Sequence, residues 1–235
     1  MRILVVNPNT TGSMTAQIGA CARAATSSPG ITVDAVNPAH GPASIESHRD
    51  EVLAALGVIE EVEAGEAAGY DGYVIACFGD PGLLAAREIA TGPVVGIAEA
   101  AMRTAAYLGR SFSVVTTLAR TVGHAHDLTH LYGVAAQCAG IHACEIPVLD
   151  LETDPTARDR ILQACKEALA TDGSDAIVLG CAGMADLCAE LSTTLGVPVV
   201  DGVAAATAEV EKLVRLGLRT GKTGEFATPP TKEIR

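Results

Sequence analysis

The sequence predicts an α/β protein of two similar lobes, each with a parallel sheet. First, short apolar runs alternate with helical stretches, which is typical of strands joined by crossover helices. Second, these runs are continuous in Val, Ile and Leu, which indicates strands buried on both faces. Third, the order of elements returns about 105 residues later, which indicates two lobes of one topology. The alternative is a single open sheet whose halves are alike by coincidence.

The first half of the chain is expected to hold four strand–helix pairs. Each apolar run there is followed by a stretch of helical composition. The expected strands are residues 3–6, 31–35, 73–76 and 94–97. The expected helices are residues 14–25, 45–68, 83–90 and 98–108.

The second half is expected to repeat that order, with one irregular section. The expected strands are residues 112–115, one or two strands within 141–149, 176–179 and 197–200. The expected helices are residues 118–131, 155–170, 184–195 and 203–216. Pro155 stands where a first-turn proline is tolerated. After Gly217 the chain is rich in Gly, Thr, Pro and Lys without an apolar period, which predicts a surface tail over 221–235.

The internal repeat matches two cysteines. Residue 77 and residue 181 are both Cys, each directly after an apolar strand and each followed two positions later by Gly. A helix, a Pro-Val-Val strand and an Ala-rich helix follow in both halves. We therefore expect Cys77 and Cys181 to occupy equivalent points of the two lobes.

Composition excludes several classes of protein. With 235 residues, 49% hydrophobic and only 19% charged, the chain is too apolar to be disordered. A net charge of −12 has the wrong sign for phosphate contacts, so no nucleic-acid partner is expected. No stretch reaches the roughly 18 apolar residues of a membrane span, and the first apolar run stops at Pro8, too early for a secretory signal. The predicted location is cytoplasmic, where the seven cysteines stay reduced.

The cysteine pair predicts two-base chemistry. Ligands of parallel α/β proteins bind beyond the carboxyl ends of strands, where Cys77 and Cys181 lie. Across a pseudo-twofold axis, one thiolate could take a proton from one face of a carbon acid while the opposite thiol delivers a proton to the other face. Both cysteines are expected just before a helix, whose N-terminus would lower the thiol pKa. Only one is expected to be ionised at a time, because two thiolates would repel.

The remaining cysteines and the histidines allow a competing hypothesis. Five cysteines have no matching partner in the repeat, and those at 21, 165 and 188 are predicted to pack on helix faces. A metal site would have to use the histidines and cysteines between His124 and Cys144. Paired Cys-x-x-Cys motifs are missing there, so no metal and no cofactor is expected.

At these motifs the sequence resembles the Asp/Glu/hydantoin racemase superfamily, and within it the hydantoin and allantoin racemases. The matching pieces cover nearly the whole chain: VVNPNTT (5–11), GPASIES (41–47), ACFGDPGL (76–83), GIAEAA (96–101), SVVTTLART (113–121), VLGCAGM (178–184) and VPVVDGVAAA (197–206). The resemblance implies two flavodoxin-like lobes with the active site between them and cofactor-independent racemisation by Cys77 and Cys181. It also implies that the last helix crosses back, so that the lobes are 1–97 plus about 205–220, and 98–204.

Departures from the family pattern narrow the expected substrate. Amino-acid racemases of this group carry Cys-Asn-Thr and Cys-Thr-His, where this chain has Cys77-Phe78-Gly79 and Cys181-Ala182-Gly183. The groups that would hold a free amino acid are missing, so a neutral hydantoin ring is expected in a pocket with apolar surface from Phe78 and Met184. The predicted substrate-binding residues are Asn7, Ile45, Phe78, Gly79, Thr116, Thr117, Ala182 and Gly183. Asp80 is predicted to cap a helix, and Ile45 or Glu46 to close over the substrate.

The predicted function is racemisation of 5-monosubstituted hydantoins, with allantoin racemisation as the near alternative. An amino-acid racemase or a decarboxylase on the same fold is a more distant alternative, and a decarboxylase needs only one of the two cysteines. A non-catalytic binding module has no reason to keep two matched thiols. The chain is expected to form a homo-oligomer, because its apolar helices with few charges leave room for an interface.

Overall fold

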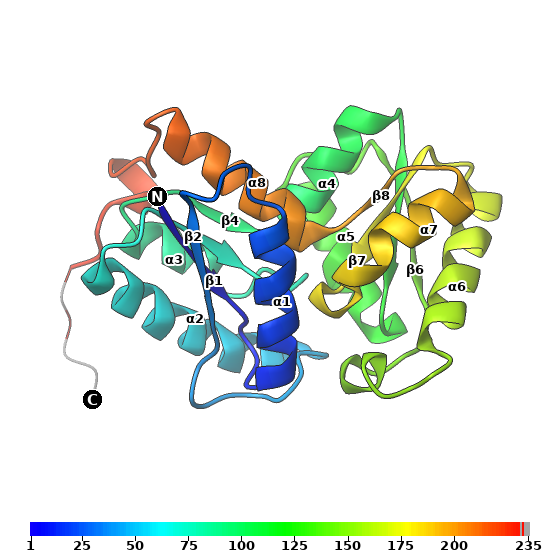
Figure 1. Cartoon of the computed structure of the whole chain (residues 1–235), viewed down its shortest axis with the longest axis horizontal. Coiled ribbons are helices and arrows are strands. Elements are labelled where there is room, and N and C mark those ends of the chain that lie inside the picture. The colour runs from blue at the N-terminus through cyan, green and yellow to red at the C-terminus, as the bar shows by residue number, and fades with distance from the viewer. Residues whose placement is uncertain (231, 233–235) are drawn as a thin grey trace.

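The computed structural model describes residues 1–230 and 232, and its described part contains two four-stranded parallel sheets (Figure 1). The first sheet has the order β2-β1-β3-β4 and the second the order β6-β5-β7-β8. The bounds are β1 (Arg2–Val6), β2 (Thr32–Val36), β3 (Gly72–Ile75), β4 (Val94–Gly96), β5 (Phe112–Thr116), β6 (Cys138–Ala143), β7 (Ala176–Gly180) and β8 (Val199–Val200). Each sheet thus has its first strand second in order, and the two topologies are the same. The predicted fold class is confirmed.

The helices cover both faces of each sheet (Figure 1). The α-helices are α1 (Gly12–Ala24), α2 (His48–Ala68), α3 (Leu83–Ile89), α4 (Ile97–Leu108), α5 (Val122–Leu131), α6 (Ala157–Asp172), α7 (Cys188–Leu195) and α8 (Gly202–Arg215). Short 3-10 helices are η1 (Ala119–Thr121), η2 (Val148–Leu151), η3 (Ala182–Leu187) and η4 (Gly224–Phe226). All helices expected from the sequence are present, with shifted ends.

Local capping explains one of the shifted ends. The helix expected from residue 45 begins at His48, because the Ser47 hydroxyl accepts a hydrogen bond from the Asp50 N–H at 3.2 Å. The helix expected from Pro155 begins at Ala157, so that Pro155 precedes the first turn. The helices expected at 118–131 and 184–195 each divide into a 3-10 turn and a shorter α-helix. The irregular section holds one strand, β6, followed by η2.

The central strands are buried on both faces, as their continuous apolar composition predicts. All residues of β3, β5 and β7 are buried, as expected for central strands with helices on both faces. The edge strands β2 and β6 are only partly buried. The parallel register brings the carboxyl ends of β1 and β3 to one edge of the first sheet, and those of β5 and β7 to one edge of the second.

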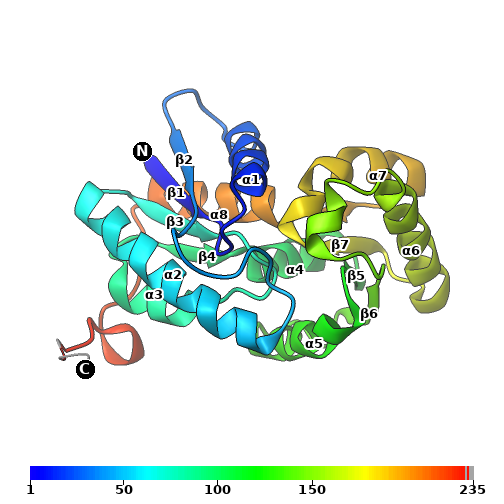
Figure 2. The same cartoon turned by 90° about the horizontal axis from the view of Figure 1, so that it is seen from below.

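Two helices each pack on the sheet that does not directly precede them in the chain. Helix α8 follows the last strand of the second sheet but packs on the first, where Val203, Ala206 and Val210 share a core cluster with Ile3 and Val74. Helix α4 follows the first sheet and packs on β5 and β7 of the second. Figure 2 shows α8 beside the first sheet and α4 reaching toward the second, and the two helices contact each other. The lobe boundaries at residues 97, 204 and 220 stay a prediction.

The C-terminal segment begins with an anchored stretch. Lys222 Nζ donates hydrogen bonds to the carbonyl oxygens of Arg87 and Glu88 at 2.7 and 2.8 Å. Most residues from 221 to 230 are exposed. The predicted tail over 221–235 lies partly outside the described residues. Within the described part of the chain, no helix is long and apolar enough to cross a membrane.

Candidate active site

The candidate site is a pocket between the two sheets, at the carboxyl ends of their central strands. Its lining comes from both lobes, with residues 76–79 from the first and residues 116, 117 and 180–182 from the second. Cys77 follows β3 and Cys181 follows β7, and both side chains line this pocket. The structure therefore brings together the two cysteines that the repeat singles out.

Each cysteine sulfur has an equivalent backbone partner in its own loop. The Gly79 N–H hydrogen-bonds the Cys77 sulfur, and the Gly183 N–H hydrogen-bonds the Cys181 sulfur. In both loops the donor is the residue two positions after the cysteine. A hydrogen bond from a backbone N–H favours the thiolate over the thiol. The two loops thus offer equivalent support to a negative charge on either sulfur.

The expected lowering of the thiol pKa is wrong for this structure. Burial raises the pKa of Cys77 well above its usual range, and the negative charge of Glu51 raises it further. Burial also raises the pKa of Cys181, to about 11. The expected helix dipole is weak, because α3 begins only at Leu83 and Cys181 precedes a short 3-10 helix. Desolvation of the charged form therefore outweighs the backbone N–H groups.

Most predicted substrate-binding residues line the pocket, and two do not. Those in the lining are Ile45, Phe78, Gly79, Thr116, Thr117 and Ala182. Asn7 lies outside the lining and is fully buried, with its Nδ2 donating to Asn9 Oδ1 at 2.9 Å. Gly183 lies behind Cys181, where a Cβ would be 3.0 Å from Leu151 Cδ1. Asn7 thus orients Asn9, and Gly183 supports Cys181 through its N–H.

Met184 also differs from expectation. It is fully buried in the core of the second lobe, beside Val115 and Ile161, and does not line the pocket. Besides the predicted Ile45, Phe78 and Ala182, the apolar lining comes from residues that the sequence did not single out, namely Met14, Ala76, Ala125 and Val148. Polar lining residues missed by the sequence are Asn9, Glu51, Thr121 and His124. Asn9 and Thr121 belong to quoted motifs, and the sequence singles out His124 only as a metal-ligand candidate. Glu51 lies in the first turn of α2, where no local signal marks it.

The rim of the pocket is closed by a loop that joins the lobes. Glu46 Oε1 accepts a hydrogen bond from the Val148 N–H at 2.7 Å, and this bond links the first lobe to η2 of the second. The same loop is hydrogen-bonded to the loop that follows β1, because the Thr11 hydroxyl donates to the Ala43 carbonyl oxygen at 2.7 Å. Ile45 is held between these two bonds and lines the pocket. This placement fits the predicted closing role of Ile45 and Glu46.

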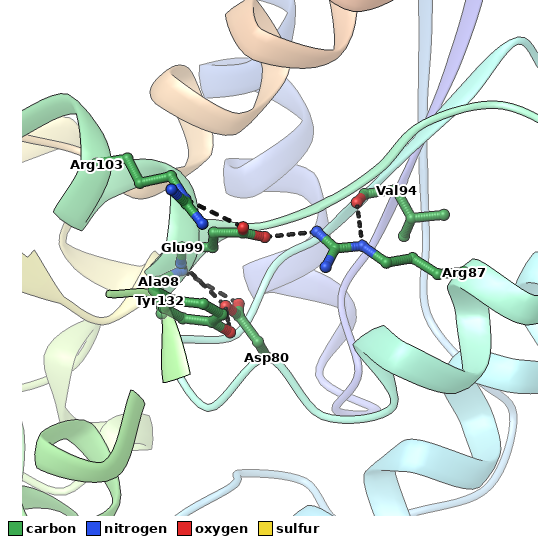
Figure 3. A network of polar contacts seen from close by, with 7 residues as sticks. All are labelled: Asp80, Arg87, Val94, Ala98, Glu99, Arg103 and Tyr132. Atoms are coloured by element: carbon green, nitrogen blue, oxygen red, sulfur yellow. Dashed lines mark hydrogen bonds and ion pairs between the residues drawn. The ribbon is translucent and has the colours of Figure 1, made fainter. Parts of the chain in front are cut away.

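Asp80 caps a helix, but a distant one. Its carboxylate accepts hydrogen bonds from the Ala98 and Glu99 N–H groups at 3.1 and 3.0 Å, which are in the first turn of α4 (Figure 3). The Tyr132 hydroxyl, at the end of α5, donates to the same carboxylate at 2.6 Å. Burial raises the pKa of Asp80 to about 7. The local helix α3 has Gly82 at its N-cap position and no side-chain cap.

The polar network around Asp80 extends away from the pocket. Glu99 pairs with Arg87 at 2.5 Å and with Arg103 at 3.1 Å, and Arg87 Nε donates to the Val94 carbonyl oxygen (Figure 3). The network therefore links the Cys77 loop to α3, β4 and α4. Asp80 stands at φ +47° in this loop, a left-handed conformation that the bonds to α4 and Tyr132 hold in place.

The histidines that suggested a metal site are dispersed. His124 is hydrogen-bonded to the Gly79 carbonyl oxygen, and His142 is hydrogen-bonded to Asp172 at 2.7 Å. The ring centroids of His126 and His130 are 5.0 Å apart. Among residues 1–230 and 232, no group of three or more His, Cys, Asp or Glu side chains could hold a metal ion.

Two topologically equal sheets that each contribute a cysteine loop to one shared pocket define a two-lobed α/β enzyme. The family model for Asp/Glu/Hydantoin racemase matches residues 3–210. The chain therefore belongs to the Asp/Glu/hydantoin racemase family, as its motifs indicate, and it is an isomerase.

Individual relatives agree with this assignment. A hydantoin racemase of Rhizobium meliloti is 48% identical over 99% of this chain and 96% of its own length. The structure of an allantoin racemase from Klebsiella pneumoniae superposes with a TM-score of 0.97 at 52% identity, covering 100% of this chain and 96% of that chain. An arylmalonate decarboxylase, at 18% identity and a TM-score of 0.64 over 91% and 92% of the two chains, shares the fold.

Proposed function

We propose that this protein racemises 5-monosubstituted hydantoins at C5 by proton transfer between Cys77 and Cys181. The observation that carries the proposal is the placement of the two thiols. They come from equivalent loops of two lobes, line one pocket, and each receives the N–H of the glycine two positions later. A proton donor and a proton acceptor on opposite sides of one carbon are what inversion requires.

The reaction is a balanced transfer of two protons. The thiolate of one cysteine takes the C5 proton, and the electron pair of the C–H bond passes into the neighbouring ring carbonyl as an enolate. The thiol of the other cysteine then gives its proton to the opposite face of C5. The product leaves with inverted configuration, and the two cysteines have exchanged protonation states. The Gly79 and Gly183 N–H groups stabilise whichever sulfur carries the negative charge.

The lining of the pocket suits a neutral ring. Phe78, Ile45 and Val148 supply apolar surface, while Asn9 and the threonines at 116 and 117 supply a few hydrogen-bonding groups. Among the described residues, no Lys or Arg lines this pocket. A free amino acid would leave its carboxylate without a cationic partner, which disfavours the amino-acid racemase alternative. The decarboxylase alternative does not explain the second matched thiol.

The substrate is proposed as a hydantoin with one substituent at C5, and allantoin is one member of that class. Both a hydantoin racemase and an allantoin racemase are similar to this chain over its whole length. Assembly as a homo-oligomer and a cytoplasmic location stay predictions. Exposed apolar side chains at the end of α4 support assembly, since Tyr107 is 86% exposed and Leu108 50%.

Replacement of either thiol tests the two-base assignment. Cys77→Ser and Cys181→Ser are each expected to abolish net racemisation, measured by polarimetry with a single enantiomer. In deuterated water, each variant is expected to retain exchange at C5 for one enantiomer only, with opposite preferences, because one base remains on one face. Cys165→Ser, a change at a buried cysteine outside the pocket, is the matched control. Racemisation near the wild-type rate in either pocket variant would overturn the assignment.

A further inference from the structure

A carboxylate without a hydrogen-bond partner forms the wall of the pocket beside Cys77. Glu51 extends from α2 across Gly79, where a Cβ would collide with its carboxylate. Its side chain is only 21% exposed. Among the described residues, no donor lies within hydrogen-bond distance of its oxygens. The proposed mechanism gives this group no proton to move.

His124 lies close to Glu51 but serves another acceptor. Its Nε2 is 3.9 Å from Glu51 Oε1 and 3.1 Å from the Gly79 carbonyl oxygen. A carbonyl oxygen only accepts, so the Nε2 proton is directed at Gly79. The His48 ring meets the His124 ring edge-on at 5.9 Å and contacts it from the side. The Glu51 carboxylate therefore receives no hydrogen bond from His124 and can accept one from a ligand.

Glu51 stands where the pocket meets a second cavity, which we call the polar annex. The annex is lined by Glu46, Ser47, His48 and Arg120, and it shares Glu51, Thr121 and His124 with the pocket. The walls around the two cysteines are mostly apolar, whereas this junction and the annex are polar. A ring held between the thiols can thus direct its substituent at C5 toward hydrogen-bonding groups.

The chemistry of Glu51 defines the substituent that it would accept. A partly buried carboxylate is costly unless it receives hydrogen bonds, and the only ion-pair partner of Glu51 among the described residues is His124 at 3.9 Å. The two N–H groups of a ureido group that point away from its carbonyl are parallel, and they match the two carboxylate oxygens as a fork. An alkyl or aryl group offers no donor and would strip water from the carboxylate. We infer that Glu51 is a specificity-determining residue that selects hydantoins with a ureido group at C5.

The position of Glu51 favours a short, neutral donor over a long cationic chain. Its carboxylate lies over Gly79, two residues from Cys77, and its negative charge raises the pKa of the Cys77 thiol. A substituent bonded directly to C5 can reach the Glu51 carboxylate, whereas a chain of four carbons would place an ammonium group beyond that carboxylate. This inference rests on the proposed function, because it assumes a hydantoin ring between the cysteines.

A pair of substrates with substituents of similar size tests the inference. Allantoin and 5-isobutylhydantoin have substituents of equal branching and size, and only the first has N–H donors. The measurement is the ratio of their kcat/KM values in wild type, in Glu51→Gln and in Glu51→Leu. The wild type is expected to favour allantoin. The ratio is expected to fall by at least about tenfold in Glu51→Gln and about a hundredfold in Glu51→Leu.

The ratio separates recognition from other effects of Glu51. Loss of its charge also changes Cys77, but that change acts on both substrates and cancels in the ratio. Glu60→Gln, on the exposed face of the same helix, removes a carboxylate elsewhere and is expected to leave the ratio unchanged. Circular dichroism checks the fold of each variant, and Glu51→Gln keeps the side-chain shape if Glu51→Leu fails to fold.

Distinct outcomes overturn distinct claims. If the wild type racemises both substrates and the Glu51 variants leave the ratio unchanged, the role of Glu51 is wrong while the racemase function stands. If kcat/KM in the Glu51 variants falls more for 5-(4-aminobutyl)hydantoin than for allantoin, Glu51 recognises a cation instead. If the wild type racemises none of the three hydantoins, the proposed function itself fails.

Discussion

At the scale of single residues, the two matched cysteines are not electrostatically equal. Both thiols are buried. The negative charge of Glu51 is the second-largest cause that raises the Cys77 pKa, whereas for Cys181 the raising effects of Cys144 and Glu46 rank below the lowering effect of the Gly183 N–H. Cys181 is therefore the easier thiol to ionise. At neutral pH both groups are thiols, and the first proton to leave is that of Cys181, which then gives one base and one acid facing the pocket.

The pH dependence of alkylation checks this order. Iodoacetamide reacts with thiolates, and a pKa of about 11 for Cys181 means that its thiolate fraction grows about tenfold per pH unit up to pH 10. We expect the alkylation rate of Cys181, followed by peptide mass spectrometry, to rise throughout pH 7–10 without a plateau. Cys77 should react more slowly, and faster in Glu51→Gln. A plateau of the Cys181 rate below pH 9 would contradict the raised pKa.

At the scale of elements, the Cys77 loop and helix α4 form one unit. Asp80 leaves its own helix uncapped and instead satisfies two N–H groups at the start of α4. Gly96 permits this approach, because a Cβ there would collide with the Asp80 carboxylate. Tyr132 adds a bond from the second lobe. The position of the Cys77 loop is thus tied to a helix that packs on the opposite sheet.

The buried carboxylate makes stability depend on pH. The folded-state pKa of Asp80 is about 7, above the roughly 3.9 of an unfolded chain, so the folded state holds its proton to higher pH. The contribution of Asp80 to the free energy of unfolding is therefore full below pH 4 and is lost as the pH rises to 7. Relative to Asp80→Asn, wild type should lose on the order of 4 kcal/mol across that window.

Urea unfolding of both proteins at pH 4.5 and pH 8 measures this difference. Asp127→Asn, at an exposed position of α5, serves as the control for the loss of a carboxylate. If the free-energy difference between wild type and Asp80→Asn is the same at both pH values, the buried carboxylate is not the titrating group.

At the scale of the whole molecule, the exchanged helices couple the two lobes. Helix α8 completes the core of the first sheet, α4 packs on the second, and the two helices meet at the junction (Figure 2). Gly72 and Gly202 allow this packing, since a Cβ at Gly72 would approach Val210 and one at Gly202 would approach Ile97. Neither sheet is covered by elements of its own half of the chain alone. The pocket between them therefore depends on both halves being folded.

Cooperative unfolding follows from this exchange. Val210 on α8 is fully buried against the first sheet, so Val210→Ala should cost about 2 kcal/mol through lost burial and a small cavity. We expect wild type and variant each to unfold in a single transition, with the whole transition shifted in the variant, as followed by calorimetry. Val52→Ala, at an exposed position of α2, is the matched control. Two separate transitions in the variant would show that the lobes are independent.

The sequence by itself determined the elements, the sheet class and the pair of cysteines. Continuous apolar runs predict buried parallel strands, and the repeat places Cys77 and Cys181 at equivalent strand ends, where parallel sheets gather their side chains. These features depend on neighbours in the chain and on topology. They are therefore visible in composition, spacing and internal similarity, and the family resemblance rests on the same motifs.

Only the tertiary structure decided the surroundings of those cysteines. Glu51 and His124 come from the first turns of helices in different lobes, so no spacing marks their approach to Cys77. Asp80 caps α4 because β4 brings that helix beside its loop, although the chain order suggests α3. The thiol pKa values rise because distant segments exclude water from the pocket. Burial and contacts between remote segments are properties of packing, and a local sequence pattern does not encode them.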